Sequence, residues 1–188
     1  VMPITRIVWL VLLVSVAPVL HADALSFSWL DLAATSLQPD QGTAGHGGRL
    51  ALSYALSNQA FMYVDGSQQA FDTQRDRRYD FGVGINTDPA AGYVLYATVG
   101  WDHAGVDYPA APGRLAHGFD AGVGVRTLLA EHWELDAGAH YAHNEVLAES
   151  TSGDIGIRYA LTTHLSLGAG LVVDASQTTY LLSLRIYY

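Results

Sequence analysis

Four histidines lie near acidic residues in the second half of the chain, and histidine with a carboxylate is a pairing that transfers protons or holds metal ions. His103 and His117 flank one expected loop, and His140 and His143 stand where a strand enters the next loop. Acids such as Asp102, Asp107 and Glu145 are nearby in sequence. The set allows a metal site or a histidine–acid pair at the rim of a fold, but histidine is also an ordinary polar residue at such a rim.

Established catalytic spacings are missing from the sequence. There is no G-x-S-x-G, no H-E-x-x-H and no glycine-rich phosphate loop. Ser152 with His140 is the nearest approach to a serine–histidine–acid set. We therefore predict no catalytic residue, no metal site and no cofactor, and the role of the four histidines stays open.

A second set of charged residues occupies alternate positions within apolar segments. Successive side chains of a β-strand point to opposite faces, so these charges share one face. The residues are Arg49, Arg126, Arg158, Arg185, Asp65, Asp80, Asp120, Glu134, Asp136 and Asp154. Buried charges must be paired or hydrated, and the planar fork of arginine can hold two carboxylates. The pattern predicts an interior salt-bridge network or a water-filled interior.

Aromatic residues mark the opposite face in pairs that are eight residues apart. The pairs are Tyr93 and Trp101, Trp133 and Tyr141, and Tyr180 and Tyr188. At a strand tilt of ~40° this spacing is roughly 20 Å, close to the height of an outer-membrane apolar band. Apolar residues such as Leu95 and Leu135 lie between the rings on the same face. This indicates a lipid-facing surface with an aromatic girdle at each edge, the soluble alternative being a secreted sandwich or lipocalin-like barrel.

The N-terminus predicts export. Arg6 precedes an apolar run from Ile7 to Val19, and Ala22-Asp23-Ala24 supplies a small-residue cleavage site. We expect a signal peptide over residues 1–24 and a single domain over residues 25–188. The chain has no cysteine, 50% hydrophobic and 14% charged residues, as suits a closed barrel in lipid. A net charge of −9 without any lysine argues against nucleic acid as a partner.

Alternating polarity predicts an all-β chain folded as a transmembrane antiparallel up-and-down β-barrel. Short and long connections alternate along most of the chain, with loops expected at 34–47, 67–77, 103–116 and 143–151. Ten strands are expected near 25–33, 48–56, 59–66, 78–87, 92–102, 117–129, 133–142, 152–161, 165–174 and 178–188. The first strands alternate poorly, and eight strands is the alternative.

Repeated strand openings and the C-terminus carry a family resemblance. Asp80-Phe81-Gly82-Val83-Gly84 recurs as Asp120-Ala121-Gly122-Val123-Gly124, and the chain ends Leu184-Arg185-Ile186-Tyr187-Tyr188. The chain resembles the small bacterial outer-membrane β-barrels of the OmpA-like and OmpX-like class. The resemblance implies the outer membrane of a Gram-negative-type envelope, with its lipids as partners. It also implies recognition of the terminal aromatic residue by the barrel-assembly machinery.

Three functions fit this class. The first is a structural or surface-interaction role through external loops, with an unknown ligand. Inward glycines could instead leave a path for a narrow, porin-like, cation-leaning channel, or they could only relieve crowding beneath large side chains. The third is a barrel enzyme that acts on outer-leaflet lipid. Arg75, Arg77 and Arg78 of the second expected loop could bridge outer-leaflet phosphates.

Overall fold

The computed structural model describes residues 25–72, 74–88, 92–108, 111–144 and 149–188. The predicted signal peptide over residues 1–24 therefore lies outside the described residues. Within the described ranges no helix is long and apolar enough to cross a membrane. Ten strands account for most of the described chain: β1 (Trp29–Pro39), β2 (Gly45–Ser57), β3 (Ala60–Ala70), β4 (Arg75–Asn86), β5 (Tyr93–Tyr108), β6 (Ala111–Ala130), β7 (Trp133–Asn144), β8 (Ser150–Ala160), β9 (Leu165–Asp174) and β10 (Gln177–Tyr187).

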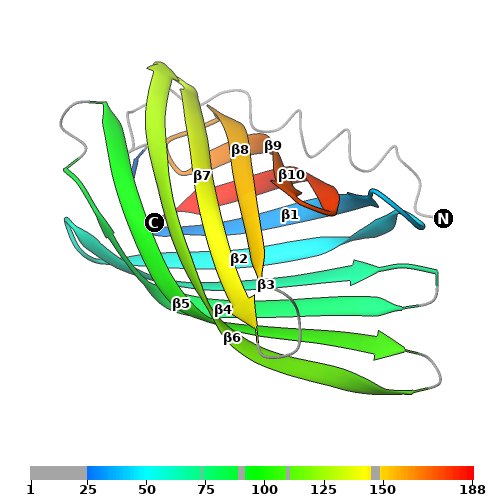
Figure 1. The fold of residues 1–188 in the computed structure, drawn as a ribbon. Coiled ribbons are helices and arrows are strands. Elements are labelled where there is room, and N and C mark those ends of the chain that lie inside the picture. The colour runs from blue at the N-terminus through cyan, green and yellow to red at the C-terminus, as the bar shows by residue number, and fades with distance from the viewer. Residues whose placement is uncertain (1–24, 73, 89–91, 109–110, 145–148) are drawn as a thin grey trace, which may run out of the picture.

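The strands form one closed antiparallel barrel (Figure 1). Each strand pairs with its sequence neighbours, and β1 closes the ring against β10 from Trp29 opposite Tyr187 to Pro39 opposite Gln177. Closure pairs each of the ten described strands on both edges, which explains how a chain without disulfides can be held together. The predicted ten-stranded up-and-down barrel is confirmed, and the eight-stranded alternative is wrong.

Two sequence predictions about strand boundaries are corrected. The first strand begins at Trp29 rather than at Leu25, because residues 25–28 turn inward and bury Phe27. The segments 34–47, 67–77 and 103–116 are mostly strand rather than loop, since β1 to β6 continue pairing well beyond the apolar region. His103 and His117 therefore face each other across β5 and β6 instead of flanking a loop.

The two ends of the barrel differ. The start of β1 and the end of the chain marked C lie at the end that carries the β2–β3, β4–β5, β6–β7 and β8–β9 turns (Figure 1). In outer-membrane barrels this is the periplasmic end. We call it the base, and the opposite end, which carries the extended β3–β4 and β5–β6 hairpins, the external end.

Large apolar side chains cover the outside of the barrel. Leu50, Phe81, Ile85 and Val123 are exposed on three different strands, β2, β4 and β6. Of the six residues of the expected aromatic girdles, Tyr93, Trp101, Trp133, Tyr180 and Tyr188 are exposed, and Tyr141 is partly exposed. Exposing so large and continuous an apolar surface to water would be unfavourable. The barrel has its apolar side out and its charges in, which contradicts the soluble alternatives.

Glycines on the inward face lie beneath large side chains on one part of the wall. A Cβ added at Gly84 would meet the ring of Phe61, and one added at Gly124 would meet the ring of Tyr96. At Gly156 the nearest atoms are backbone, 3.6 Å away or more. The wall of β4 to β6 is thus filled by aromatic rings, whereas on β8 and β9 the Arg158 side chain covers Gly168 and backbone atoms are nearest to Gly156 and Gly170.

Candidate functional site: the barrel lumen

A buried ion pair lies near the base of the lumen. Arg126 on β6 donates from Nε to Glu134 Oε1 on β7 over 2.8 Å, and the two side chains are only 2% and 6% exposed. Tyr187 on β10 donates its hydroxyl to the other oxygen of Glu134 over 3.0 Å. Arg185 lies 3.8 Å from Glu134 Oε1. One carboxylate therefore ties β10 to β6 and β7, which are not its neighbours in the ring.

Asp31 extends this network to the seam where the barrel closes. Its Oδ2 accepts from Arg185 Nε at 2.9 Å and lies 2.7 Å from Arg158 Nη2. The guanidinium of Arg185 also stacks 4.0 Å above the ring of Trp29. Sequence reasoning missed Asp31 because the first strand alternates poorly. Asp31 stands opposite Arg185, and this position can be recognised only when β1 is paired with β10.

The segment 25–28 enters the lumen and contacts this network. Arg126 Nη1 donates to the carbonyl oxygen of Ser26 over 2.8 Å, and its guanidinium lies 5.0 Å from the ring centre of Phe27. Phe27 stacks on Phe61 at 4.2 Å and meets Tyr96 edge-on at 5.9 Å. These contacts fill the base of the barrel with an aromatic cluster and a satisfied cation.

Two tyrosines fill the middle of the lumen. Tyr96 donates its hydroxyl to Asp136 and Tyr63 donates its hydroxyl to Asp120, each over 3.0 Å. Both acids were among the expected interior charges, but their partners are tyrosines rather than arginines. Tyr96 reaches from β5 to β7, and Tyr63 reaches from β3 to β6, so each hydroxyl spans the lumen to a strand that is not a neighbour of its own.

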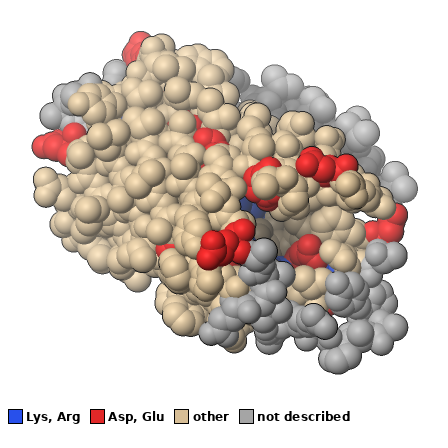
Figure 2. Space-filling view, viewed as in Figure 1, with Lys and Arg blue, Asp and Glu red and all other residues tan. Residues whose placement is uncertain are grey.

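The external half of the lumen is more accessible to water. Arg49 holds Asp65 at 2.6 Å, and Arg78 holds Asp102 at 2.8 Å, yet each of these arginine side chains is 43% exposed. Asp80 lies 3.4 Å from Arg78 and faces Asp102 in the strand register. Figure 2 shows this end as a hollow with acidic side chains around it. The lumen is therefore polarised, dry at the base and wet towards the outside.

Comparison with known proteins identifies the fold. No protein-family model and no curated protein matches the sequence. Among solved structures, the NanC porin matches with a TM-score of 0.54 at 11% identity, over 85% of this chain and all of the porin. The KdgM porin (0.48, 7% identity, 84% and 99% covered) and the β-barrel domain of Pseudomonas aeruginosa OprF (0.47, 10% identity, 86% and 98% covered) are also similar.

The chain has the fold of the small bacterial outer-membrane β-barrels. The apolar exterior agrees with this identification, since it would be exposed to water in any other location. This outer-membrane barrel shares little sequence with the structures it resembles, so its function must be argued from its own residues.

The four histidines of this outer-membrane barrel separate into distinct environments. His103 and His117 meet edge-on with ring centres 4.4 Å apart on the outer face of β5 and β6. His140 points into the lumen, where its Nε2 lies 2.9 Å from Asp154 Oδ1. His143 faces outward beside Phe119 and lies 3.4 Å from Glu149.

The acids that were expected near these histidines have other positions. Asp102 pairs with Arg78, Asp107 pairs with Arg77 at 2.7 Å, and Glu145 lies outside the described residues. Ser152 stands opposite His140 in register. No group of three metal-binding side chains forms among the residues that the structure describes.

Proposed function

We propose that this outer-membrane barrel is closed at its base and acts at the cell surface. It would do so through the external half of its lumen and through the extended β3–β4 and β5–β6 hairpins. The observation that carries the proposal is the Arg126–Glu134 pair, which is almost fully buried next to the inserted Phe27. A path for hydrated ions would have to cross this point. The same residues that hold the ring together at the base thus also close it.

Opening the base would be costly while the network is intact. Separating a buried ion pair leaves two charges without compensation, and a lone buried charge costs several kcal/mol. Arg126 additionally donates to the Ser26 carbonyl oxygen, and the stacked rings of Phe27 and Phe61 fill the space next to it. The external half, by contrast, offers charged side chains to water and to any surface ligand.

Single-channel conductance in planar bilayers tests the proposal. The chain from residue 25 onward should insert silently, with insertion checked by heat-modifiable gel mobility. A variant that lacks residues 25–28 and the variant Arg126→Leu should both show discrete conductance steps. Arg78→Leu is the matched control, because it removes an arginine from the wet half and should stay silent. Regular steps from the unmodified chain, unchanged in both base variants, would contradict a closed base.

A narrow, cation-leaning channel is the second candidate. Its support is the wet external half, where carboxylates outnumber arginines. The acids facing that part of the lumen include Asp65, Asp80, Asp102 and Asp154. Under this alternative the segment 25–28 would be displaced during conduction. Cation-selective steps from the unmodified chain would favour it over the closed barrel.

We also propose an export and assembly route for the same chain. Residues 1–24 would direct export and be removed, and Tyr188 would mark the terminal strand for the barrel-assembly machinery. Tyr188 supports this role by its exposed position on the lipid-facing side, next to the last paired residue of β10. Deletion of Tyr188 should slow assembly more than it weakens the folded barrel, whereas equal assembly rates would argue against it.

A further inference from the structure

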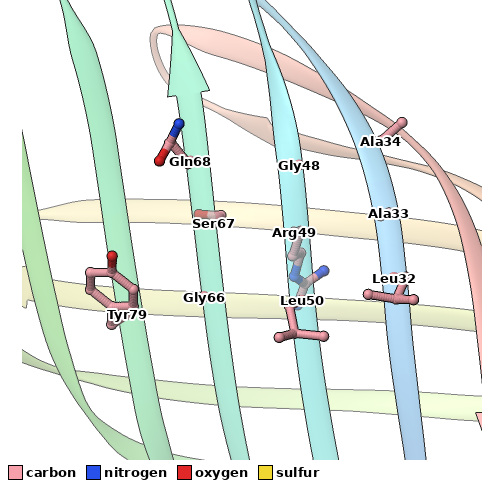
Figure 3. A pocket seen from close by; sticks show the side chains of 10 residues that line it. All are labelled: Leu32, Ala33, Ala34, Gly48, Arg49, Leu50, Gly66, Ser67, Gln68 and Tyr79. Atoms are coloured by element: carbon pink, nitrogen blue, oxygen red, sulfur yellow. The ribbon is translucent and has the colours of Figure 1, made fainter.

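A groove crosses the outer wall of the barrel over β1 to β4. It has a volume of about 560 Å³, within the range of ~300–1,000 Å³ that is typical of ligand pockets. Figure 3 shows the side chains around it. The lining residues that face outward include Leu32, Ala34, Gly48, Leu50, Gly66 and Tyr79.

Two glycines create the groove. Leu32, Leu50, Gly66 and Tyr79 follow one another in register across the four strands, and Gly48 is two residues beyond Leu50 towards the external end. A Cβ at Gly48 would meet only the carbonyl oxygen of Ala33, at 3.4 Å, so the space above it is open. At Gly66 the ring of Tyr79 lies 3.4 Å from the place of a Cβ, whereas at Gly48 the floor is bare backbone, and Leu32 and Leu50 stand beside it (Figure 3).

The external mouth of the groove is cationic. Arg77 and Arg75 follow Tyr79 on the same face of β4, towards the external end. Arg77 pairs with Asp107 at 2.7 Å, but both side chains are more than two-fifths exposed. An exposed ion pair of this kind contributes little, and the five N–H donors of arginine allow a second acceptor. His46 stands in the same register row as Arg75, two strands away.

We propose that this groove binds one acyl chain of an outer-leaflet lipid, with the phosphorylated headgroup of that lipid held by Arg75 and Arg77. The apolar floor lies at the depth of the acyl chains, and the arginines lie where phosphates collect at the membrane surface. Planar guanidinium groups bind phosphate through two parallel hydrogen bonds. Along the barrel wall towards the external end, the apolar groove comes first and the arginines follow. An anionic lipid of the outer leaflet has the same order, with its acyl chain first and its phosphorylated headgroup next.

Titration of the folded chain with bis-phosphorylated lipid A, followed by native mass spectrometry from detergent, tests this site. We expect one lipid to be retained. Arg77→Gln should weaken binding about tenfold, the effect of losing one charge-assisted hydrogen bond. Gly48→Leu should weaken it similarly by filling the groove. Asp107→Asn should strengthen binding, because it removes a negative charge beside the phosphate and leaves Arg77 in place.

The matched control is Gly153→Leu, which adds the same side chain to another outward-facing glycine, on β8, with open space around it. It should bind lipid A like the unmodified chain, and dephosphorylated lipid A should bind weakly to all variants. Equal retention by the Gly48 and Gly153 variants would overturn the proposal. So would a protein dimer that disappears in Gly48→Leu, since a second copy of the chain would then occupy the groove.

Discussion

Arg126 shows what a single residue contributes to this barrel. Its guanidinium pairs with Glu134, donates to the Ser26 carbonyl oxygen and stacks near Phe27. Lysine could not satisfy three partners in one plane, because its ammonium group is a point charge. The residue therefore joins β6, β7 and the inserted segment 25–28, and it does so in a place that water scarcely reaches.

Replacing Arg126 by leucine should destabilise the folded barrel by about 3–5 kcal/mol, because Glu134 would keep a buried charge with a weaker set of partners. The double variant Arg126→Leu with Glu134→Leu should recover much of that loss. Urea unfolding from lipid vesicles, followed by tryptophan fluorescence, measures both. Additive losses in the double variant would show that the two residues act independently.

Alternation along the strands was enough to predict which charges face the lumen, but not which of them meet. Arg49, Arg158 and Arg185 all face inward, as their spacing indicated. Their partners depend on which strand lies opposite at which register, and a strand period of two residues carries no such information. Phe27 could not be placed either, because a segment that leaves the sheet has no periodicity to read.

At the scale of the strands, glycine decides where the lumen is filled. Gly82, Gly84 and Gly124 lie beneath Tyr63, Phe61 and Tyr96, so the rings rest directly on the backbone. The sequence left two explanations for these glycines, a path for solutes or relief of crowding. On β4 to β6 the contacts favour relief of crowding, whereas on β8 and β9 the glycines Gly156 and Gly170 have only backbone atoms near them.

Two alanine substitutions separate these roles. Gly124→Ala should destabilise the barrel by roughly 1–3 kcal/mol, because the new methyl group would overlap the ring of Tyr96. Gly156→Ala should be close to neutral, since its methyl group would meet nothing nearer than 3.6 Å. Unfolding in urea gives both values under the same conditions. Equal losses at the two positions would mean that the rings do not rest on the glycines as described.

The number of strands and their antiparallel arrangement could be predicted from the sequence, but the residues at which the strands end could not. The apolar alternation stops where the membrane stops, and the prediction ended β5 near residue 102, whereas β5 and β6 continue pairing to Tyr108 and Ala111. Cross-strand contacts such as the one between His103 and His117 hold the polar part of this hairpin. Nothing in a polar alternation distinguishes an extended hairpin from a loop.

In the molecule as a whole, apolar side chains face the lipid and charged side chains face the lumen. This polarity predicts the effect of a charge on the outer wall. Leu95 is exposed between Tyr93 and Trp101, so Leu95→Arg should cost about 2–4 kcal/mol if it lies near the middle of the bilayer. Leu95→Ala is the control, and folding into vesicles is the measurement. Equal free energies of folding for the two variants would place Leu95 away from lipid.

The central claim concerns the lumen as a whole, which is wet towards the outside and closed at the base. Because the chain has no cysteine, single serine-to-cysteine variants report on water access at chosen depths. Ser67 faces the external half, and Ser53 is fully buried towards the base. A charged maleimide added outside the membrane should label Ser67→Cys readily and leave Ser53→Cys unlabelled until residues 25–28 are deleted. Equal labelling of both cysteines in the full-length barrel would contradict the claim.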